Sequence, residues 1–236
     1  MQSVSGILGI LHNLMKKHKI INISGESGTG KTTFGLQLVG NFLTSNYPFK
    51  ESCIWVQANE SFPIKRLLRM FKNSPEKVSY LQKNIFITPR DKCLNTYSNQ
   101  SQLVRNIIDG HTTLPPNLRF IVIDNISHHF RYEISKYKNI NLIISLIDDF
   151  YDSQLLPLIM FCQRKGIYLV LIHEISYDPN AEKNRSFLFK LYDRLDTLKI
   201  ELEYMYNRCD RKARILTQDY YQEFLYTLHD MGLEIK

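Results

Sequence analysis

The sequence predicts an α/β fold with a mostly parallel central sheet flanked by helices and with antiparallel strands near the C-terminus. Continuous apolar runs that fit buried strands alternate with segments of helical periodicity, as expected when helices cover both faces of a parallel sheet. After about Thr197 the pattern changes to short apolar runs separated by polar turns, which predicts antiparallel strands that extend one sheet edge. The expected strands cover residues 20–23, 53–56, 85–87, 120–123, 167–172, 198–204, 213–217 and 224–228.

Two helical segments stand out between and before these strands. Apolar residues at helical spacing predict an amphipathic lead-in helix over residues 1–18, whose apolar stripe we expect to pack on the sheet rather than on a partner subunit. The segment 139–165 is also helical in pattern, and Pro157 is expected to kink or restart that helix while residues 155–161 pack in the core. Loops are expected at residues 47–50, 112–117 and 176–186.

Composition narrows the class of protein. The 236 residues are 44% hydrophobic and 22% charged, which is ordinary for a globular chain, and the formal net charge of +7 favours an anionic partner such as nucleic acid. No apolar run is long enough to span a membrane, and the start lacks the pattern of a secretory signal. The four cysteines lie far apart, and the adjacent His128 and His129 have no third ligand at suitable spacing, so neither a disulfide framework nor a zinc site is indicated.

A glycine-rich segment joins the first expected strand to a helical pattern, which is the order that a phosphate-binding P-loop requires. Glycines allow backbone N–H groups to approach phosphate oxygens, and the helix that follows adds the positive end of its dipole. In such a loop Lys31 reaches the β- and γ-phosphates and the Thr32 hydroxyl ligates Mg²⁺, whereas Thr33 is expected to cap the helix or pack. The segment reads Gly25-Glu26-Ser27-Gly28-Thr29-Gly30-Lys31-Thr32.

A second element supports the same site. The apolar run 120–123 ends in Asp124, and a carboxylate at the end of a buried strand can hold a magnesium-bound water beside Thr32. We therefore expect a nucleoside triphosphate and Mg²⁺ as cofactors, and the family resemblance described next implies that the triphosphate is ATP.

Beyond these two motifs the chain resembles the Rad-type recombinase paralogues and the RadB-like proteins of the RecA superfamily. Residues 55–67 resemble that family's strand, acidic segment and F-P-x-x-R-L helix start, and residues 122–133 resemble its V-I-D-S and F-R-x-E signature. The resemblance spans most of the chain. It implies a RecA-type P-loop ATPase core over residues 1–236, without a separate N-terminal DNA-binding domain and without the F-x-x-A tether of self-polymerising recombinases.

The resemblance also implies a function and further site residues. It suggests an accessory or mediator factor in homologous recombination and DNA repair, working in a hetero-complex with other recombinase paralogues or the main recombinase, in the nucleus or, if archaeal, in the cytoplasm. Arg66 matches the family's arginine near the adenine, with an ordinary surface arginine on a helix as an equal alternative. The family's DNA-binding loops correspond to residues 132–141 and 175–190, with ordinary solvated loops as an equal alternative. The candidate contacts to single-stranded DNA are Arg131, Lys136, Lys138, Lys183 and Arg185.

Two positions depart from the family pattern. The glutamate that polarises the attacking water is replaced by Asn59, and Glu60 one place along would point to the opposite face of a strand. Glu174 stands where the family commonly has a γ-phosphate-sensing glutamine, and an acid there would repel phosphate unless a metal, a proton or a basic partner intervened. We therefore expect at most weak, DNA-dependent ATP hydrolysis, with Glu60 as a doubtful catalytic candidate.

Two other classes of function stay open. A P-loop phosphotransferase for a small molecule would need an acceptor-binding carboxylate and an arginine-rich lid, for which only Arg185 and Arg194 are available. A RecA-like signalling ATPase would be expected to keep its pair of catalytic acids, which Asn59 interrupts.

Overall fold

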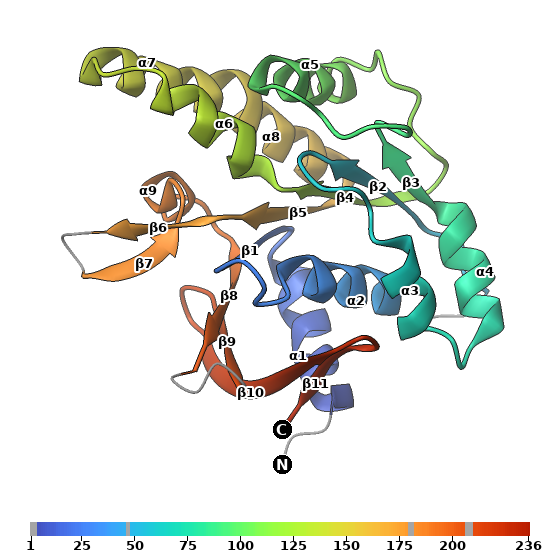
Figure 1. The fold of residues 1–236 in the computed structure, drawn as a ribbon. Coiled ribbons are helices and arrows are strands. Elements are labelled where there is room, and N and C mark those ends of the chain that lie inside the picture. The colour runs from blue at the N-terminus through green and yellow to red at the C-terminus, as the bar shows by residue number, and fades with distance from the viewer. Residues whose placement is uncertain (1–3, 46–47, 179–181, 206–209) are drawn as a thin grey trace.

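The computed structural model describes residues 4–45, 48–178, 182–205 and 210–236. A central sheet seen edge-on in Figure 1 separates two groups of helices. The helices are α1 (Val4–Lys17), α2 (Lys31–Leu43), α3 (Ile64–Met70), α4 (Pro75–Asn84), α5 (Tyr97–Ile108), α6 (Ile126–Ser135), α7 (Ile140–Phe150), α8 (Leu156–Lys165) and α9 (Phe189–Tyr192). The strands are β1 (Ile20–Gly25), β2 (Ser52–Gln57), β3 (Ile85–Thr88), β4 (Leu118–Asp124), β5 (Tyr168–His173), β6 (Ile175–Asp178), β7 (Lys183–Ser186), β8 (Leu198–Tyr204), β9 (Arg211–Leu216), β10 (Tyr221–His229) and β11 (Gly232–Ile235).

The main sheet has nine strands in the order β11-β10-β9-β8-β1-β5-β4-β2-β3. The strands from β1 to β3 in this order are parallel, and their buried side chains alternate between two cores. Trp55 faces the core shared with α1 to α4, whereas its neighbours Ile54 and Val56 face the core shared with α5 to α8. This period-2 alternation explains why the strands are apolar at every position and confirms the predicted fold class.

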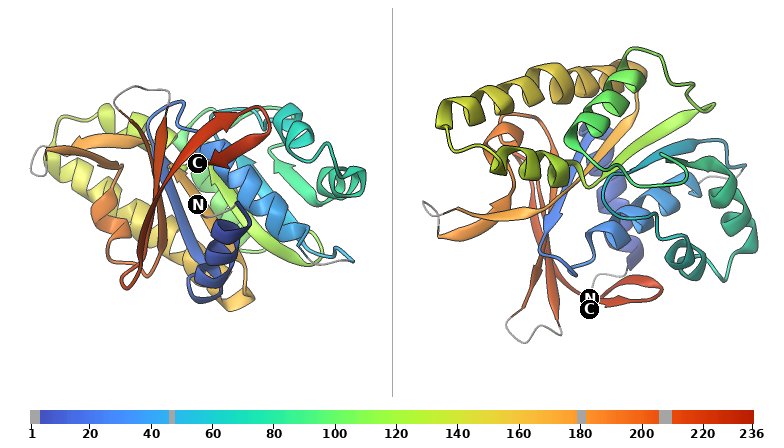
Figure 2. Two further views of the ribbon diagram at one scale, coloured as in Figure 1. Left: turned by 90° about the horizontal axis from the view of Figure 1, so that it is seen from below. Right: turned by 45° about the horizontal axis from the view of Figure 1, so that its top comes forward.

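The C-terminal strands differ from the prediction in one respect. β8 was expected to begin the antiparallel part of the sheet, but it pairs in parallel with β1, and only β9, β10 and β11 run antiparallel. These last strands curve around α1 and α2, as the two views in Figure 2 show. Ile7, Leu11 and Met15 of α1 are buried in the core that this curvature closes, as the apolar stripe predicted.

The long helical segment 139–165 is interrupted earlier than expected. A π-helical turn, Tyr151–Leu155, joins α7 to α8, and Pro157 follows it at the second residue of α8, so the helix continues through the proline with its irregular turn just before it. Leu155 and Leu158 are buried, in agreement with the expected core packing of residues 155–161.

The expected loop at 176–186 is instead a two-stranded antiparallel hairpin of β6 and β7. It begins directly after β5 and projects from the main sheet (Figure 1). The hairpin escaped prediction because its strands are short and polar, so they lack the apolar alternation of a half-buried strand.

Neither a membrane span nor a metal cluster is present in the described ranges. There, no helix combines the length and the apolar character needed to cross a bilayer, and no three His, Cys, Asp or Glu side chains gather in a way that could hold a metal ion. Cys53 and Cys162 are buried thiols, and burial raises the pKa of Cys162 to about 12. Cys209 lies outside the described residues.

Candidate nucleotide-binding site

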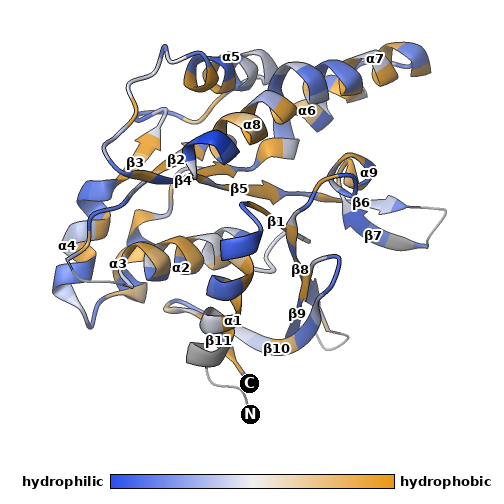
Figure 3. Ribbon diagram, turned by 180° about the vertical axis from the view of Figure 1, so that it is seen from behind, coloured by the Kyte–Doolittle hydropathy of each residue, from blue (hydrophilic) through white to orange (hydrophobic). Residues whose placement is uncertain are grey.

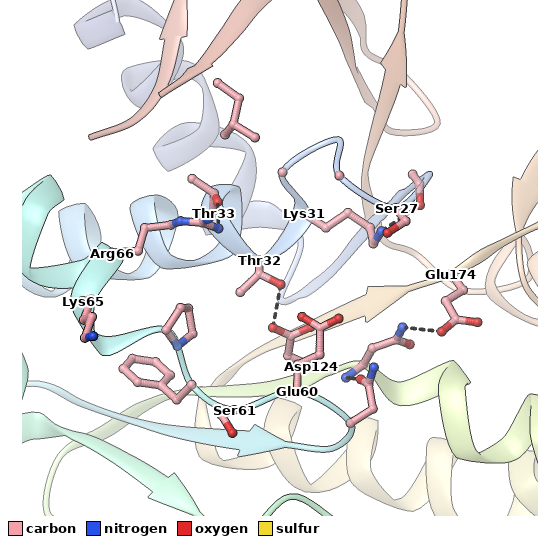
Figure 4. A pocket seen from close by; sticks show the side chains of 18 of the residues that line it. Ser27, Lys31, Thr32, Thr33, Glu60, Ser61, Lys65, Arg66, Asp124 and Glu174 are labelled. Atoms are coloured by element: carbon pink, nitrogen blue, oxygen red, sulfur yellow. Dashed lines mark hydrogen bonds between the residues drawn. The ribbon is translucent and has the colours of Figure 1, made fainter. Parts of the chain in front are cut away.

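The carboxyl ends of β1, β2, β4 and β5 open into one cleft of about 900 Å³. This is the edge at which open α/β sheets bind ligands, because chain reversals there leave space between the loops. The P-loop forms one wall, and the segments that follow β2, β4 and β5 form the other (Figure 4). The cleft therefore joins residues that are far apart in the sequence, from Gly25 to Asp230.

Two glycines of the loop are required by its backbone. Gly28 has φ 80° and Gly30 has φ 100°, in the left-handed region that side chains with a Cβ rarely adopt. A Cβ at Gly28 would also meet the Tyr204 hydroxyl of β8, and one at Gly30 would lie 3.0 Å from the Leu228 side chain of β10. The loop is thus shaped by the C-terminal strands as well as by its own sequence.

Lys31 begins α2 and points into the concave side of the loop. Its ammonium group donates to the carbonyl oxygens of Gly25 and Glu26, both at 2.9 Å. Burial lowers the pKa of Lys31, and the nearby carboxylates of Asp124, Glu174 and Glu60 partly oppose that shift. The amine is therefore held by weak neutral acceptors, which a phosphate oxygen can replace.

Thr32 and Asp124 meet as the sequence predicted. The Thr32 hydroxyl donates to Asp124 Oδ2 at 2.8 Å, across 92 positions of sequence (Figure 4). Burial raises the pKa of Asp124 to about 6, the Thr32 hydrogen bond and Lys31 lower it, and Glu60 raises it. Burial disfavours the charged form of this carboxylate, and a cation bound beside it would stabilise that charge.

These residues fit a magnesium-bound nucleoside triphosphate. Hydroxyl and carboxylate oxygens are the ligands that Mg²⁺ prefers, usually one or two from the protein with water and phosphate completing the shell. Thr32 and Asp124 would hold the ion, and Lys31 with the N–H groups of the loop would hold the phosphates. The bound metal would supply charge neutralisation of the phosphates.

The opposite wall corrects the expectation for Glu60. β2 ends at Gln57, so Asn59 and Glu60 lie in irregular backbone where strand alternation no longer applies. Both residues line the cleft, and Glu60 lies beside Asp124 in Figure 4. Asn59 is engaged elsewhere, because its Oδ1 accepts from the backbone N–H of Asn125 at 3.1 Å.

Glu174 is surrounded by donors. Its Oε1 accepts from Asn125 Nδ2 at 3.2 Å and lies 2.9 Å from His128 Nδ1, while its Oε2 lies 3.4 Å from Arg131 Nη1. Its backbone N–H donates to the Ser127 hydroxyl at 2.8 Å. The acid is therefore accompanied by the basic partner that an acid beside phosphate requires.

One end of the cleft is formed by α3 and the segment before it. Arg66 lines the cleft, and its guanidinium donates to the buried Thr33 hydroxyl at 2.7 Å, so Thr33 packs and accepts rather than capping the helix. Arg69 and Asp230 form an ion pair of 2.7 Å that joins α3 to the turn between β10 and β11. No local pattern marks this pair in the sequence, because its members lie 161 positions apart.

The DNA candidates do not form one group. Arg131 lies on α6 and lines the nucleotide cleft, where it donates to the Ile175 carbonyl at 3.0 Å, apart from the other four candidates. Lys136 and Lys138 lie between α6 and α7, where Lys136 pairs with Glu133 at 2.7 Å. The other two candidates, Lys183 and Arg185, lie on β7.

Arg185 of the hairpin already has two partners. Its Nε lies 3.3 Å from Asp178 Oδ2, and its guanidinium lies 4.4 Å from the centre of the Phe189 ring. A strand of DNA would have to compete with both contacts.

Two tyrosines of the C-terminal strands were missed at the sequence level. The hydroxyl of Tyr204 donates to the Ser27 carbonyl at 3.1 Å, and that of the buried Tyr226 donates to the Thr29 carbonyl at 2.7 Å. Each satisfies a carbonyl of the P-loop. Only the pairing of β8 with β1 brings them there, so no local pattern could have indicated them.

Fold and cleft together define a P-loop nucleotide-binding protein of RecA type. A family model described as an AAA domain matches residues 14–171, which include β1 to β4, the first part of β5 and both nucleotide motifs. The chain belongs to this AAA-domain family and is a RadB-like protein of the RecA superfamily.

Two curated relatives carry the printed name DNA repair and recombination protein RadB. The one from Pyrococcus horikoshii is 26% identical over 185 residues, covering 77% of this chain and 69% of the relative. The one from Pyrococcus furiosus is 24% identical over 180 residues, covering 75% and 68%. Both come from archaea, so they lend no support to the nuclear location that the sequence suggested. A crystal structure titled RadB recombinase shares the fold, with a TM-score of 0.66 at 19% identity over 91% of this chain and 89% of that one.

Proposed function

We propose that this chain is an ATP-binding accessory factor in homologous recombination and DNA repair. In this proposal it binds ATP with Mg²⁺ through Lys31, Thr32 and Asp124, hydrolyses it slowly, and assists a recombinase on single-stranded DNA within a hetero-complex. The proposal rests on a difference between the two walls of the cleft. The P-loop wall has the groups that would bind ATP, whereas the facing wall lacks the expected catalytic glutamate.

The hydrogen bonds of the second wall support slow turnover. Hydrolysis of a triphosphate depends on a group that orients the attacking water and on donors that meet the developing charge. Asn59 cannot accept a proton and is engaged with Asn125, while Glu174 carries negative charge toward the phosphate side. Glu60 is the carboxylate of this wall that acts on both Asp124 and Lys31, and we assign it the remaining catalytic role.

Adenine is the base that we expect, with Arg66 and Pro63 beside it. Both residues line the cleft at the start of α3. A guanidinium over the base would add stacking to the phosphate contacts.

The recombination role rests on the relatives and on charge. The curated relatives are named for DNA repair and recombination, and the formal charge of +7 favours a polyanion. Lys136 and Lys138 before α7, with Lys183 and Arg185 on the hairpin, are the proposed DNA contacts. We expect the partner to be a recombinase or a second paralogue.

Binding and turnover of labelled ATP by the purified chain test the proposal. Lys31→Ala removes the only side-chain cation that reaches the loop carbonyls among the described residues, so we expect ATP affinity to fall by about 3 kcal/mol, or about a hundredfold. Arg164→Ala on the surface of α8 is the matched control and should bind as the original chain does.

Turnover should be slow with or without single-stranded DNA, and DNA retention should fall as salt rises. Brisk turnover, or turnover that transfers phosphate to a small acceptor, would contradict the accessory function. Binding that survives Lys31→Ala unchanged would show that nucleotide is held elsewhere.

A further inference from the structure

A second cavity, of about 360 Å³, lies at the edge of the sheet opposite the nucleotide cleft. Its lining comes from the second half of α1, the end of α2, the segment before β2 and the first residues of β4 and β5. The described residues that line it are all different from those of the nucleotide cleft. Its volume lies within the range of about 300 to 1,000 Å³ that is typical of ligand sites, so it suits a unit of nucleotide size.

Cations dominate the charged groups of this cavity. Lys16, Lys50 and Arg119 line it, against one acid, Glu51. Within the ranges that the structure describes, Glu51 is paired with Arg119, whose Nε lies 3.2 Å from its Oε1, whereas Lys16 and Lys50 take part in no ion pair. The cavity therefore carries uncompensated positive charge, which favours an anionic ligand.

Arg119 is held in one orientation at this site. Its Nη1 donates to the Gly166 carbonyl at 3.2 Å, and its guanidinium lies 4.8 Å from the centre of the buried Tyr168 ring. The ammonium group of Lys19 lies 4.1 Å from the centre of the same ring. Because these contacts fix the guanidinium before any ligand arrives, an anion that binds there has less conformational freedom to remove.

Helix dipoles account for only part of this charge. Lys16 lies in the last turn of α1, where a cation is favourable without any ligand, and the basic ends of α1 and α8 are both blue in Figure 3. Lys50 and Arg119, however, lie outside the helices. Two carbonyls at the end of α2, which would repel an anion, already accept from side-chain hydroxyls at 2.7 and 2.8 Å.

Aromatic rings form the apolar part of the same cavity. His12 and Phe42 line it and stack on each other, with ring centres 5.1 Å apart and planes inclined by 26°. Phe42 is held in turn by edge contacts with Phe120 and Tyr168, at 5.0 and 5.2 Å. Both stacked rings stay partly exposed. A ring stack beside cations can take an unpaired base, whereas an acidic peptide would use the cations alone.

We propose that this cavity binds one nucleotide unit of a single strand of nucleic acid. Its phosphate would lie on Lys16, Lys50 and Arg119, and its base against His12 and Phe42. A base in a duplex is already stacked on both faces, so the site selects single strands. This goes beyond the proposed function, which places DNA on elements that follow the carboxyl ends of β4 and β5, at the other edge of the sheet.

Fluorescence anisotropy of a labelled oligothymidylate of about twelve nucleotides, without ATP, measures binding by the full chain. The chain is compared with a Lys138→Ala, Lys183→Ala variant, which removes two loop contacts and leaves the binding at the cavity. In that background, Lys16→Glu with Lys50→Glu should weaken binding about thirtyfold, since two phosphate contacts become repulsive. Lys83→Glu, in the last turn of α4, is the matched control and should bind as the background does. Circular dichroism confirms that each variant is folded.

A substitution at His12 tests the stacking. His12→Ala should weaken binding of the oligothymidylate about tenfold, since the base loses a ring to stack on, and His12→Phe should restore it. Binding of an abasic strand of the same length should not respond to either substitution, because that strand has phosphates but no bases. A glutamate peptide of equal charge should bind more weakly than the oligothymidylate.

Binding that survives the two charge reversals unchanged would overturn the proposal. So would an abasic strand as sensitive to His12→Ala as the oligothymidylate, or a glutamate peptide that binds as tightly. ATP affinity of the same variants should equal that of the original chain, and it reports on the nucleotide cleft separately. Failure at this cavity is thereby distinguished from failure of the proposed ATP-binding function.

Discussion

The sequence predicts residues on both walls of the cleft, the P-loop wall and the wall that faces it. In the structure the predicted residues of the two walls are bonded in different ways. On the P-loop side, Lys31, Thr32 and Asp124 take the positions that their motif implies. On the other side, Asn59 and Glu174 both bond to Asn125. Except for Asp124 at the end of β4, the first wall is one continuous loop, whereas the second wall is assembled from the segments that follow three separate strands. Binding and turnover can therefore change independently in this fold.

We expect the largest effect from a substitution in the first wall, at the residue that would hold the metal ion. Asp124→Asn removes the charge that would hold Mg²⁺ but keeps an oxygen for the Thr32 hydroxyl, so we expect magnesium-dependent ATP affinity to fall about a hundredfold. Isothermal titration with and without Mg²⁺ measures this. Equal losses in both conditions would show that Asp124 does not act through the metal.

The same variant should be more stable than the original chain without ligand. The pKa of Asp124 is raised from the ordinary aspartate value of 3.8 to about 6 in the folded chain, so ionisation opposes folding as pH rises through that range. The free energy of unfolding of Asp124→Asn should therefore exceed that of the original chain by about 3 kcal/mol above pH 7, with the difference shrinking below pH 6 and absent below pH 4. Urea unfolding at pH 4, 6 and 8 measures it, and a gain that does not depend on pH would exclude this origin.

A substitution at Gly28 tests whether the backbone of the P-loop wall requires glycine. Gly28→Ala forces a Cβ into the left-handed region and against the Tyr204 hydroxyl, so we expect a loss of about 2 kcal/mol in unfolding free energy. Adding Tyr204→Phe should recover part of the loss by removing the hydroxyl. If the double variant recovers the full unfolding free energy, the left-handed backbone at residue 28 costs nothing. If it recovers none, the contact with the Tyr204 hydroxyl costs nothing.

The second wall is tested by its catalytic candidate. Glu60→Gln should lower the slow turnover about tenfold while ATP affinity changes little, because the amide keeps the size of the side chain but cannot accept a proton. Single-turnover hydrolysis measures the rate. An unchanged rate would assign residual turnover to water alone.

The smallest expected effect is at the acid that replaces the family's glutamine. Glu174→Gln removes a negative charge near Lys31 and frees Arg131 from its ion pair, so ATP affinity should rise about threefold, more than ADP affinity does. Comparative titrations with ATP and ADP measure the ratio. A fall in ATP affinity would show that the network around Glu174 positions the wall rather than repelling phosphate.

The parallel sheet, the P-loop and the partnership of Thr32 with Asp124 could all be predicted from the sequence alone. Each depends on information that is local or periodic: continuous apolar strands, glycines at fixed spacing, and a carboxylate at the end of a strand. In a parallel sheet the carboxyl ends of the strands lie at the same edge, and this does not depend on the conformation of the loops between them. For the same reason the lead-in helix and the core residues of α8 were predictable.

The remaining features of the site depend on how the whole chain packs. Glu60 enters the cleft because β2 ends before it, Arg131 turns to the nucleotide side because Glu174 attracts it, and Tyr204 reaches the loop because β8 pairs in parallel with β1. The β6–β7 hairpin likewise follows from where β5 ends. Such contacts depend on register and on chain ends, which one sequence specifies only through the packing of the whole molecule.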